Sequence, residues 1–163
     1  YVSAGRYEKA LNQVQRLIEL DPQFYGSYWL LGMIRQTEEL YNDSTEALQK
    51  AMSLGGDQLV LSTLGLTYAL AGRRSEALNV VNRLLEMKKS GQYVSAFNVA
   101  RVFIGLEDDE KTLYWLEKAF QEQSGELVFL DAIFRMKSGE LYGKNLRINP
   151  QFQYLLRRIN ITL

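Results

Sequence analysis

Four consecutive acidic residues, Glu107, Asp108, Asp109 and Glu110, form the densest group of possible metal ligands in the chain. Calcium loops alternate their oxygen ligands and contain a glycine turn, and this run has neither feature. Acidic side chains also favour the first turn of a helix, because they complement the positive end of its dipole. The run therefore predicts a helix start and no metal site.

The segment Ser138 to Asn145 contains two glycines and a lysine, which resembles a phosphate cradle only in composition. No strand is predicted before it and the Walker spacing is absent, so we expect a connector. The chain has no His and no Cys. Catalysis would depend on Asp and Glu alone, and it would need a buried, unpaired carboxylate in a pocket. We expect no enzyme and no cofactor.

Composition and charge narrow the class of protein further. The 163 residues are 47% hydrophobic and 23% charged, which is typical of a folded domain. Nineteen basic and nineteen acidic side chains cancel, so no global field attracts nucleic acid. The longest charge-free apolar run, between Asp57 and Arg73, is too short for a membrane helix. We expect no nucleic-acid binding by this region, no membrane insertion and a cytoplasmic location.

Apolar residues recur at three and four positions, and this spacing predicts helices almost throughout. The expected ranges are 6–20, 25–39, 43–54, 58–71, 74–89, 93–105, 109–122, 126–136 and 150–159. Asp43, Asp57 and Asn149 are the predicted N-caps, with Pro150 at a first helical position. Short connections make neighbouring helices antiparallel.

Small residues return at steps of 33 to 35 residues, which indicates a repeat. In the first helix of each pair they are Gly32, Gly65 and Ala100, and in the second helix Ala10, Ser44, Ala77 and Thr112. We interpret Gly65 and Ala77 as gaps that receive bulk from a neighbouring helix. The expected bulky partners are Leu61, Leu64, Tyr68, Val81 and Leu84.

On these residues the sequence resembles the tetratricopeptide repeat (TPR) family. One copy contains Tyr28, Leu31-Gly32, Ser44, Leu48 and Ala51; the next contains Leu61, Leu64-Gly65, Tyr68, Gly72, Ala77, Val81 and Leu84. A weaker third contains Ala96, Val99-Ala100, Phe103, Thr112, Leu116 and Ala119, and residues 1–22 match the back half of an earlier copy. Glu39 and Glu107 replace the turn glycine, so those hairpins are expected to bend differently.

The resemblance implies an all-α fold: a right-handed superhelix of stacked antiparallel hairpins, an α-solenoid, over residues 1–124. Residues 125–163 are expected to be C-terminal capping helices. In this cap Leu127, Phe129, Leu130 and Phe134 would cover the third hairpin, while Phe152, Leu155 and Leu156 would close the end and leave Arg157 and Arg158 in water. The stretches YVSAFNVARVFIGL, WLEKAF and NPQFQYLLRRI also resemble C-terminal repeats behind effector domains of bacterial signalling proteins.

In such an array the first helices line a concave groove. The predicted groove residues are Trp29, Met33, Gln36, Ser62, Leu66, Leu70, Phe97, Asn98 and Arg101. One interpretation is that a partner's helix or extended segment binds there, with Trp29 and Phe97 as anchors and Asn98 and Arg101 holding polar groups. The other is that the protein's own C-terminal helices, or an adjacent subunit, cover Trp29, Met33, Leu66 and Phe97.

The family's best-known ligand is the C-terminal carboxylate of chaperones, held by a clamp of Lys, Asn and Arg. At the matching positions this chain has Trp29, Met33, Thr63, Val94 and Asn98, so only the Asn is retained. The expected function is therefore a noncatalytic scaffold that binds another protein or peptide, as part of a larger bacterial signalling or regulatory protein. The alternative is a regulatory oligomerisation domain of a transcription factor or protein kinase. In that case the repeats would form a homodimer and bind no peptide ligand.

Overall fold

The structure is a computed structural model, and it describes residues 2–135 and 144–160. Within these ranges the chain forms helices joined by short turns, with no β-strand, so the all-α prediction is confirmed. The helices are α1 (Val2–Leu20), α2 (Tyr25–Thr37), α3 (Tyr41–Ser53), α4 (Gln58–Leu70), α5 (Arg74–Lys89), α6 (Ala96–Gly105), α7 (Asp109–Gln121), the 3₁₀ helix η1 (Gly125–Phe129), α8 (Leu130–Arg135), α9 (Lys144–Ile148) and α10 (Pro150–Arg158).

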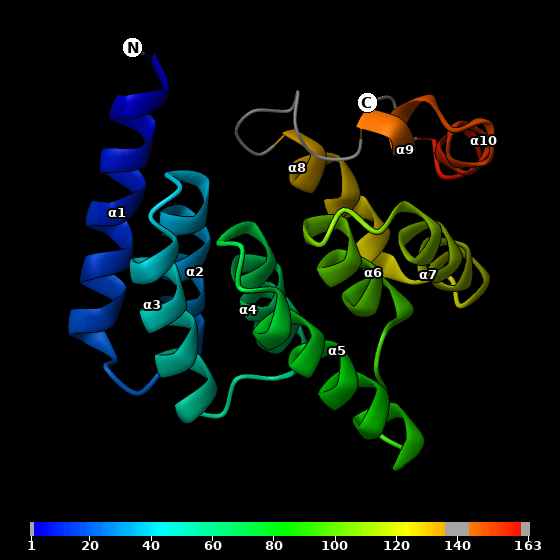
Figure 1. Cartoon of the computed structure of the whole chain (residues 1–163). Coiled ribbons are helices and arrows are strands. Elements are labelled where there is room, and N and C mark those ends of the chain that lie inside the picture. Colours follow the sequence, from blue (N-terminus) through cyan, green and yellow to red (C-terminus); the bar gives the residue numbers. More distant parts are fainter. Residues whose placement is uncertain (1, 136–143, 161–163) are drawn as a thin grey trace.

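Helices adjacent in sequence pack in pairs. The helices α2 and α3 form one hairpin, α4 and α5 a second, and α6 and α7 a third (Figure 1). The hairpins also contact one another, because α4 packs against both α3 and α6. The long helix α1 packs against α2 at one side of the molecule (Figure 1).

The three hairpin turns share one backbone geometry. Glu39, Gly72 and Glu107 all have positive φ, at 62°, 74° and 56°. In each turn the next residue donates its N–H five residues back, as in a Schellman motif: Leu40 to the Arg35 oxygen at 2.9 Å, Arg73 to Tyr68 at 2.8 Å and Asp108 to Phe103 at 3.2 Å. The expectation that the two glutamates change the bend is therefore wrong. They adopt the left-handed conformation at a steric cost of about 1 kcal/mol each.

Two of the three predicted N-caps are confirmed. The Asp57 carboxylate accepts the N–H of Leu59 at 2.8 Å. The Asn149 side chain accepts the N–H of Gln151 at 2.8 Å, with Pro150 in the first turn of α10. The prediction for Asp43 is wrong, because α3 already begins at Tyr41 and Asp43 lies inside its first turn. The helix expected from residue 93 begins only at Ala96, after Ser95 as its N-cap.

The C-terminal part differs most from the expected helices. Instead of one helix over 126–136, the chain forms η1 followed by α8. The expected connector at 138–145 falls largely outside the described residues, and its last two residues already belong to α9, which was not predicted. The predicted cap residues Leu127, Leu130, Phe134, Phe152, Leu155 and Leu156 are buried, as expected, but Phe129 is 42% exposed. Arg157 and Arg158 are both exposed, as expected. Arg158 in addition forms an ion pair with Glu117, in which Nη1 lies 3.2 Å from Oε2.

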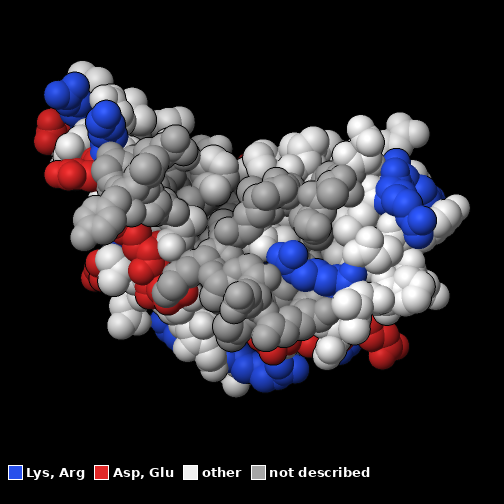
Figure 2. Space-filling model, turned by 90° about the horizontal axis from the view of Figure 1, so that it is seen from above, with Lys and Arg blue, Asp and Glu red and all other residues white. Residues whose placement is uncertain are grey.

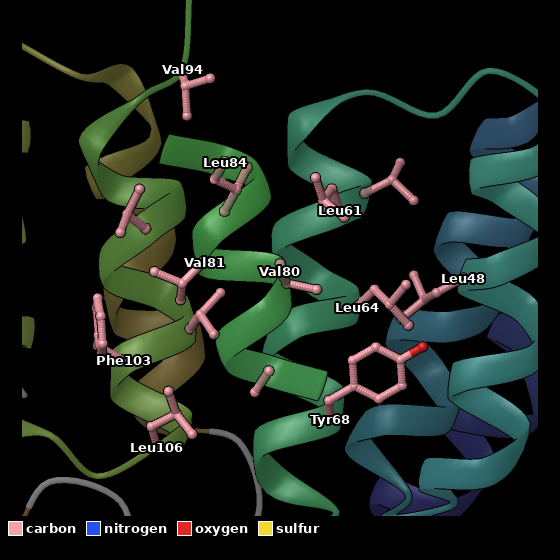
Figure 3. Close-up of a cluster of buried hydrophobic side chains, with 14 of the residues drawn as sticks. Leu48, Leu61, Leu64, Tyr68, Val80, Val81, Leu84, Val94, Phe103 and Leu106 are labelled. Carbon is pink, nitrogen blue, oxygen red and sulfur yellow. The ribbon is translucent and has the colours of Figure 1, made fainter. Parts of the chain in front are cut away.

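The glycines of α2 and α4 lie where two helices approach closely. A Cβ atom on Gly32 would lie 2.5 Å from Leu48 Cγ of α3. A Cβ atom on Gly65 would lie 2.7 Å from Val80 Cγ1 of α5 and 2.8 Å from Val102 Cγ2 of α6. The predicted gap at Gly65 is confirmed, but its nearest neighbours are Val80 and Val102. Figure 3 shows Val80 pointing toward α4 and Val81 toward α6.

Two clusters of buried side chains hold the elements together. The first core joins the hairpins and contains Leu48, Ala51, Val60, Leu61, Leu64, Tyr68, Ala77, Val80, Val81, Leu84, Val94, Val99, Val102, Phe103 and Leu106 (Figure 3). The second core joins α6 and α7 to the C-terminal part and contains Leu66, Ala96, Phe97, Ala100, Ile104, Leu116, Ala119, Leu127, Leu130, Ile133, Phe134, Leu146, Phe152, Leu155 and Leu156. The helix α4 contributes to both cores.

Replacing Gly65 by Leu tests the close approach of α4 to α5 and α6. We expect the free energy of unfolding to fall by at least about 1 to 3 kcal/mol, because the new side chain overpacks the first core. Urea unfolding followed by circular dichroism measures this change. Gly125→Ala is the matched control: a Cβ there meets nothing within 4 Å, and we expect a change below about 0.5 kcal/mol. Equal stability of Gly65→Leu and the wild type would contradict the packing described above.

Candidate binding cleft of the inner helices

The nine predicted groove residues come from three helices that lie next to one another. Trp29, Met33 and Gln36 belong to α2; Ser62, Leu66 and Leu70 to α4; and Phe97, Asn98 and Arg101 to α6. The helix α4 lies between the other two and contacts both. We call α2, α4 and α6 the inner helices.

Hydrogen bonds connect α2 to α4. The Trp29 indole donates Nε1–H to Thr63 Oγ1 at 3.1 Å. The Gln36 amide donates Nε2–H to Thr67 Oγ1 at 2.6 Å, while its Oε1 is buried without a hydrogen-bond partner. Thr63 and Thr67 lie one helical turn apart on the same face of α4. The indole and the amide therefore set the position of α2 on α4.

A second set of hydrogen bonds connects α4 to α6. Ser62 Oγ donates to Asn98 Oδ1 at 3.0 Å, and Asn98 Nδ2 donates to Gln58 Oε1 at 3.2 Å. The same Gln58 oxygen accepts the backbone N–H of Ser95 at 2.9 Å. Asn98 is fully buried and both ends of its amide are engaged, so it ties the two helices together in this structure.

Arg101 is the one groove residue that carries a charge, and it is buried. Its Nη1 donates to Thr63 Oγ1 at 2.9 Å, and its guanidinium carbon lies 5.4 Å from the centre of the Phe97 ring. Its Nε has no hydrogen-bond partner. Burial lowers the pKa of Arg101 to about 10, and the charge of Glu126 opposes part of that effect. The residue nevertheless stays protonated at neutral pH.

The protein's own C-terminal part covers much of the predicted groove. Phe97 has 0% exposed surface and Leu66 has 2%, since both pack in the second core with residues of η1, α8, α9 and α10. Leu70 is half-buried against the same core. Of the two sequence-based interpretations, coverage by the C-terminal helices describes Leu66 and Phe97. A partner could not reach Phe97 as an anchor unless this part moved. Trp29 is half-buried against the first core, and Met33 is also half-buried.

A small cleft lies between the inner helices and the C-terminal part. Its volume is about 30 Å³, and its lining consists of Met33, Gln36, Thr63, Leu66, Arg101, Phe129 and Ile133. Thr63 occupies one of the positions that match the clamp of the TPR family. Phe129 was predicted only as a cap residue and Ile133 was not predicted, because the residues after Gln123 leave the repeat phase and give no register. Thr67, which accepts a hydrogen bond from Gln36, was predictable as a residue of this face of α4, because it follows Thr63 by one helical turn.

Wider hollows lie on the outer side of the C-terminal half. One of about 590 Å³ is lined by residues of α7 and α10, including Leu113, Tyr114 and Glu117. Another of about 660 Å³ includes Phe120 and Val128. None of the nine predicted groove residues lines either hollow. Four of the nine, Met33, Gln36, Leu66 and Arg101, line the 30 Å³ cleft.

The acidic run of residues 107–110 lies at the N-terminus of α7, with Asp108 as the N-cap and Asp109 and Glu110 in the first turn. The Asp108 carboxylate accepts the Lys111 backbone N–H at 3.1 Å and the Lys111 ammonium at 2.6 Å. Burial tends to raise the pKa of Asp108, but these bonds and the charges of Lys111 and Arg74 lower it more strongly. Burial and the Asp108 charge raise the pKa of Asp109. Among the described residues, no group of acidic side chains is arranged to hold a metal ion.

Surface charge shows no dominant sign on the face seen in Figure 2. Among the described residues on this face, most charged side chains lie toward the rim and one basic group lies near the middle. This pattern agrees with the formal net charge of zero. Among the described helices, none is both long enough and apolar enough to cross a membrane.

Comparison of the chain with protein-family models, with curated proteins and with solved structures gives no match. The class of protein must therefore be inferred from the helix pairs, their turns and the cleft.

Glu122 helps to hold α6, and thereby Arg101, in place. Its Oε2 accepts the Ala96 backbone N–H at the start of α6, at 3.0 Å, and its Oε1 accepts the Lys88 ammonium at 2.7 Å. Burial tends to raise the pKa of Glu122, but the hydrogen bonds and charges lower it overall. The ionised carboxylate is thus favoured in the folded state.

We expect Glu122→Gln to lower the free energy of unfolding by about 0.5 to 1 kcal/mol at pH 7. A pKa lowered on folding contributes stability that is present above the unfolded-state pKa and is lost as the pH falls through the folded-state pKa. The difference from the wild type should therefore shrink as the pH falls below about 4.3. Urea titrations between pH 3 and 7 measure it. Exposed Glu86→Gln is the control, and an E122Q loss that does not depend on pH would contradict this role.

Proposed function

We propose that this chain is a TPR-like α-solenoid that acts as a noncatalytic protein-interaction module. Residues 1–124 would form about three and a half repeats in a right-handed superhelix, and residues 125–163 would cap them. The shared turn geometry supports this proposal, because Glu39, Gly72 and Glu107 follow one another at steps of 33 and 35 residues. The pairwise packing of helices supports it as well.

One observation carries the binding function: the first helices of three successive hairpins meet in a common cleft. Met33 of α2, Thr63 of α4 and Arg101 of α6 all line it. A partly exposed apolar side chain lies beside these polar groups: Phe129, which lines the cleft, is 42% exposed. Apolar surface beside a few polar groups of fixed orientation is typical of peptide-binding sites.

The chemistry of the cleft suits binding better than catalysis. Its polar lining consists of a hydroxyl, an amide and a guanidinium, none of which is a general base near pH 7. The resemblance of the sequence to repeats behind bacterial effector domains supports a place in a larger bacterial signalling or regulatory protein. We propose that the partner is a protein segment presented to this module.

Selection of peptides from a random displayed library against the 163-residue chain tests the proposal. Calorimetry then gives Kd for selected peptides with wild type, Met33→Asp and Leu78→Asp. We expect Met33→Asp to weaken binding at least tenfold, about 1.4 kcal/mol, because a charge replaces apolar contact at the cleft. Leu78 of α5, 36% exposed and outside the cleft, is the control and should change little.

Failure to select any peptide, or equal binding by the Met33→Asp variant, would overturn the proposal. Trp29→Ala is less suitable, although it is the obvious change. Trp29 packs against the first core and donates to Thr63, so its loss would cost about 3 kcal/mol or more of folding stability. A loss of binding in this variant could then not be separated from a loss of folding.

The exposed side of α1 favours a second candidate, regulatory oligomerisation. Leu17 is 41% exposed, whereas its counterparts one, two and three repeats later, Ala51, Leu84 and Ala119, have no exposed surface. Leu20 and Phe24 beside it are 82% and 50% exposed. Contiguous exposed apolar side chains of this kind are typical of protein interfaces.

Light scattering at micromolar concentration separates the two candidates. If peptide binding is the function, we expect a monomer, and Leu20→Asp should leave the mass unchanged. A dimer that Leu20→Asp converts to a monomer would instead favour oligomerisation through α1. Exposed Glu86→Lys on α5 controls for the change in net charge.

A further inference from the structure

A second concave surface lies on the outer side of the C-terminal half, between α7 and α10. It consists of two hollows of about 590 Å³ and 580 Å³, which share Leu113, Glu117, Gln121 and Gln151 in their linings. We call these two hollows together the outer groove. Each is within the size range of sites that hold small ligands. Among the described residues that line the outer groove, none lines the cleft of the inner helices, so the two surfaces are separate.

One part of the outer groove is apolar and aromatic. Leu113 of α7 is half-buried there, and Tyr114 of α7 and Tyr154 of α10 are 56% and 58% exposed. At the steps of the repeat, the polar and exposed counterparts of Tyr114 are Asn12, Glu46 and Asn79. The exposed ring is therefore particular to the last hairpin. Aromatic side chains are enriched at protein interfaces, which makes this surface a candidate for one.

Another part of the outer groove is negatively charged. Among the described residues that line the 590 Å³ hollow, the acidic ones are Asp109, Glu110 and Glu117, and the basic one is Lys118. The Lys118 ammonium lies over the Tyr114 ring, 5.1 Å from its centre. At the steps of the repeat, the uncharged counterparts of Glu117 are Gln15, Gln49 and Asn82. Three carboxylates and one ammonium leave an excess of negative charge here, although the formal net charge of the chain is zero.

Two of these carboxylates have no partner in the described part of the chain. Glu117 forms an ion pair with Arg158, but the side chains of Asp109 and Glu110 form no hydrogen bond and no ion pair there. Burial and the Asp108 charge raise the pKa of Asp109, as expected for a carboxylate without a nearby cation. A cation from outside the described chain would stabilise both ionised groups.

We infer that the outer groove binds a basic segment of a partner protein, in which an Arg or Lys side chain pairs with the carboxylates of Asp109 and Glu110. On α7, Leu113 lies one helical turn after Asp109, and Tyr114 lies one turn after Glu110. The carbon stem of the basic side chain, and the apolar residues beside it in the partner, therefore contact Leu113 and Tyr114. Charge complementarity selects this partner, because the same carboxylates would repel nucleic acid and anionic lipid. This surface is independent of the proposed binding in the cleft of the inner helices.

Two matched peptides test the role of the charge. Acetyl-Leu-Arg-Leu-amide, and the same peptide with uncharged citrulline in place of arginine, are titrated into the ¹⁵N-labelled chain while the backbone amide signals of α7 and α10 are followed by NMR. We expect saturable shifts of these signals with the arginine peptide. The citrulline peptide should bind at least about tenfold more weakly, because it lacks the charge-assisted hydrogen bonds. Equal binding of the two peptides, or no saturable shift with the arginine peptide, would overturn the inference.

Variants test the residues assigned to the outer groove. The double variant Asp109→Asn, Glu110→Gln should lose the saturable shifts. The double variant Glu19→Gln, Glu86→Gln removes the same charge at exposed carboxylates of α1 and α5, and it should bind as the wild type does. Tyr114→Asn introduces the residue type of two repeat counterparts, so it should fold and bind more weakly. Unchanged binding by the Asp109→Asn, Glu110→Gln variant would contradict the assignment, and if that variant does not fold, the two peptides with the wild type still decide.

Further measurements separate other occupants and the proposed function. Acetyl-Gly-Arg-Gly-amide lacks the apolar neighbours and should bind more weakly than the leucine peptide; equal binding would reduce the site to general attraction of a cation and overturn the inference. Shifts of the same signals that grow with protein concentration before peptide is added would assign the groove to a second copy of this chain, with the same consequence. Met33→Asp alters only the cleft of the inner helices and should leave the binding unchanged, whereas loss of binding in this variant would place the peptide in the cleft. Failure of the peptide selection would overturn the proposed function and leave this inference standing.

Discussion

The close approach of α4 to α5 and α6 is the constraint on which the rest of the structure depends. It requires a residue without a side chain at position 65, because Val80 and Val102 occupy the space on both sides. With α4 fixed between its neighbours, one side of the helix enters the first core and the other, through Leu66, enters the second. The relative position of α4 and α6, two of the three inner helices, follows from this contact.

Polar contacts along the inner helices add direction to this apolar packing. Thr63 is the meeting point: it accepts from Trp29 of α2 and from Arg101 of α6 and donates to its own helix backbone. Hydrogen bonds are directional, so they fix the relative rotation of helices that apolar contact alone would leave less defined. The same network leaves one donor, on Arg101, and one acceptor, on Gln36, without partners.

The repeat period made much of the fold predictable, because small residues such as Gly32 and Gly65 mark close contacts directly in the sequence. The turns were harder, since Glu39 and Glu107 adopt a left-handed backbone that their side chains disfavour, and only tertiary packing decides this. The groove residues were placed on the correct helices from helical spacing. Coverage by the C-terminal helices was one of two open interpretations. Which of their residues line the cleft was not predictable, since Phe129 and Ile133 come from a segment with no repeat register.

The burial of α4 has a consequence for how the chain opens and closes. Val60 to Tyr68 are nine consecutive buried residues, so no face of this stretch can meet water without loss. Repeat proteins often unravel one unit at a time from an end, because each unit contacts only its neighbours. Here we expect such fraying to stop at α4, because unfolding this helix would expose apolar residues of both cores at once. The middle of the chain should thus behave as one cooperative block, with its amides exchanging hydrogen only through global unfolding.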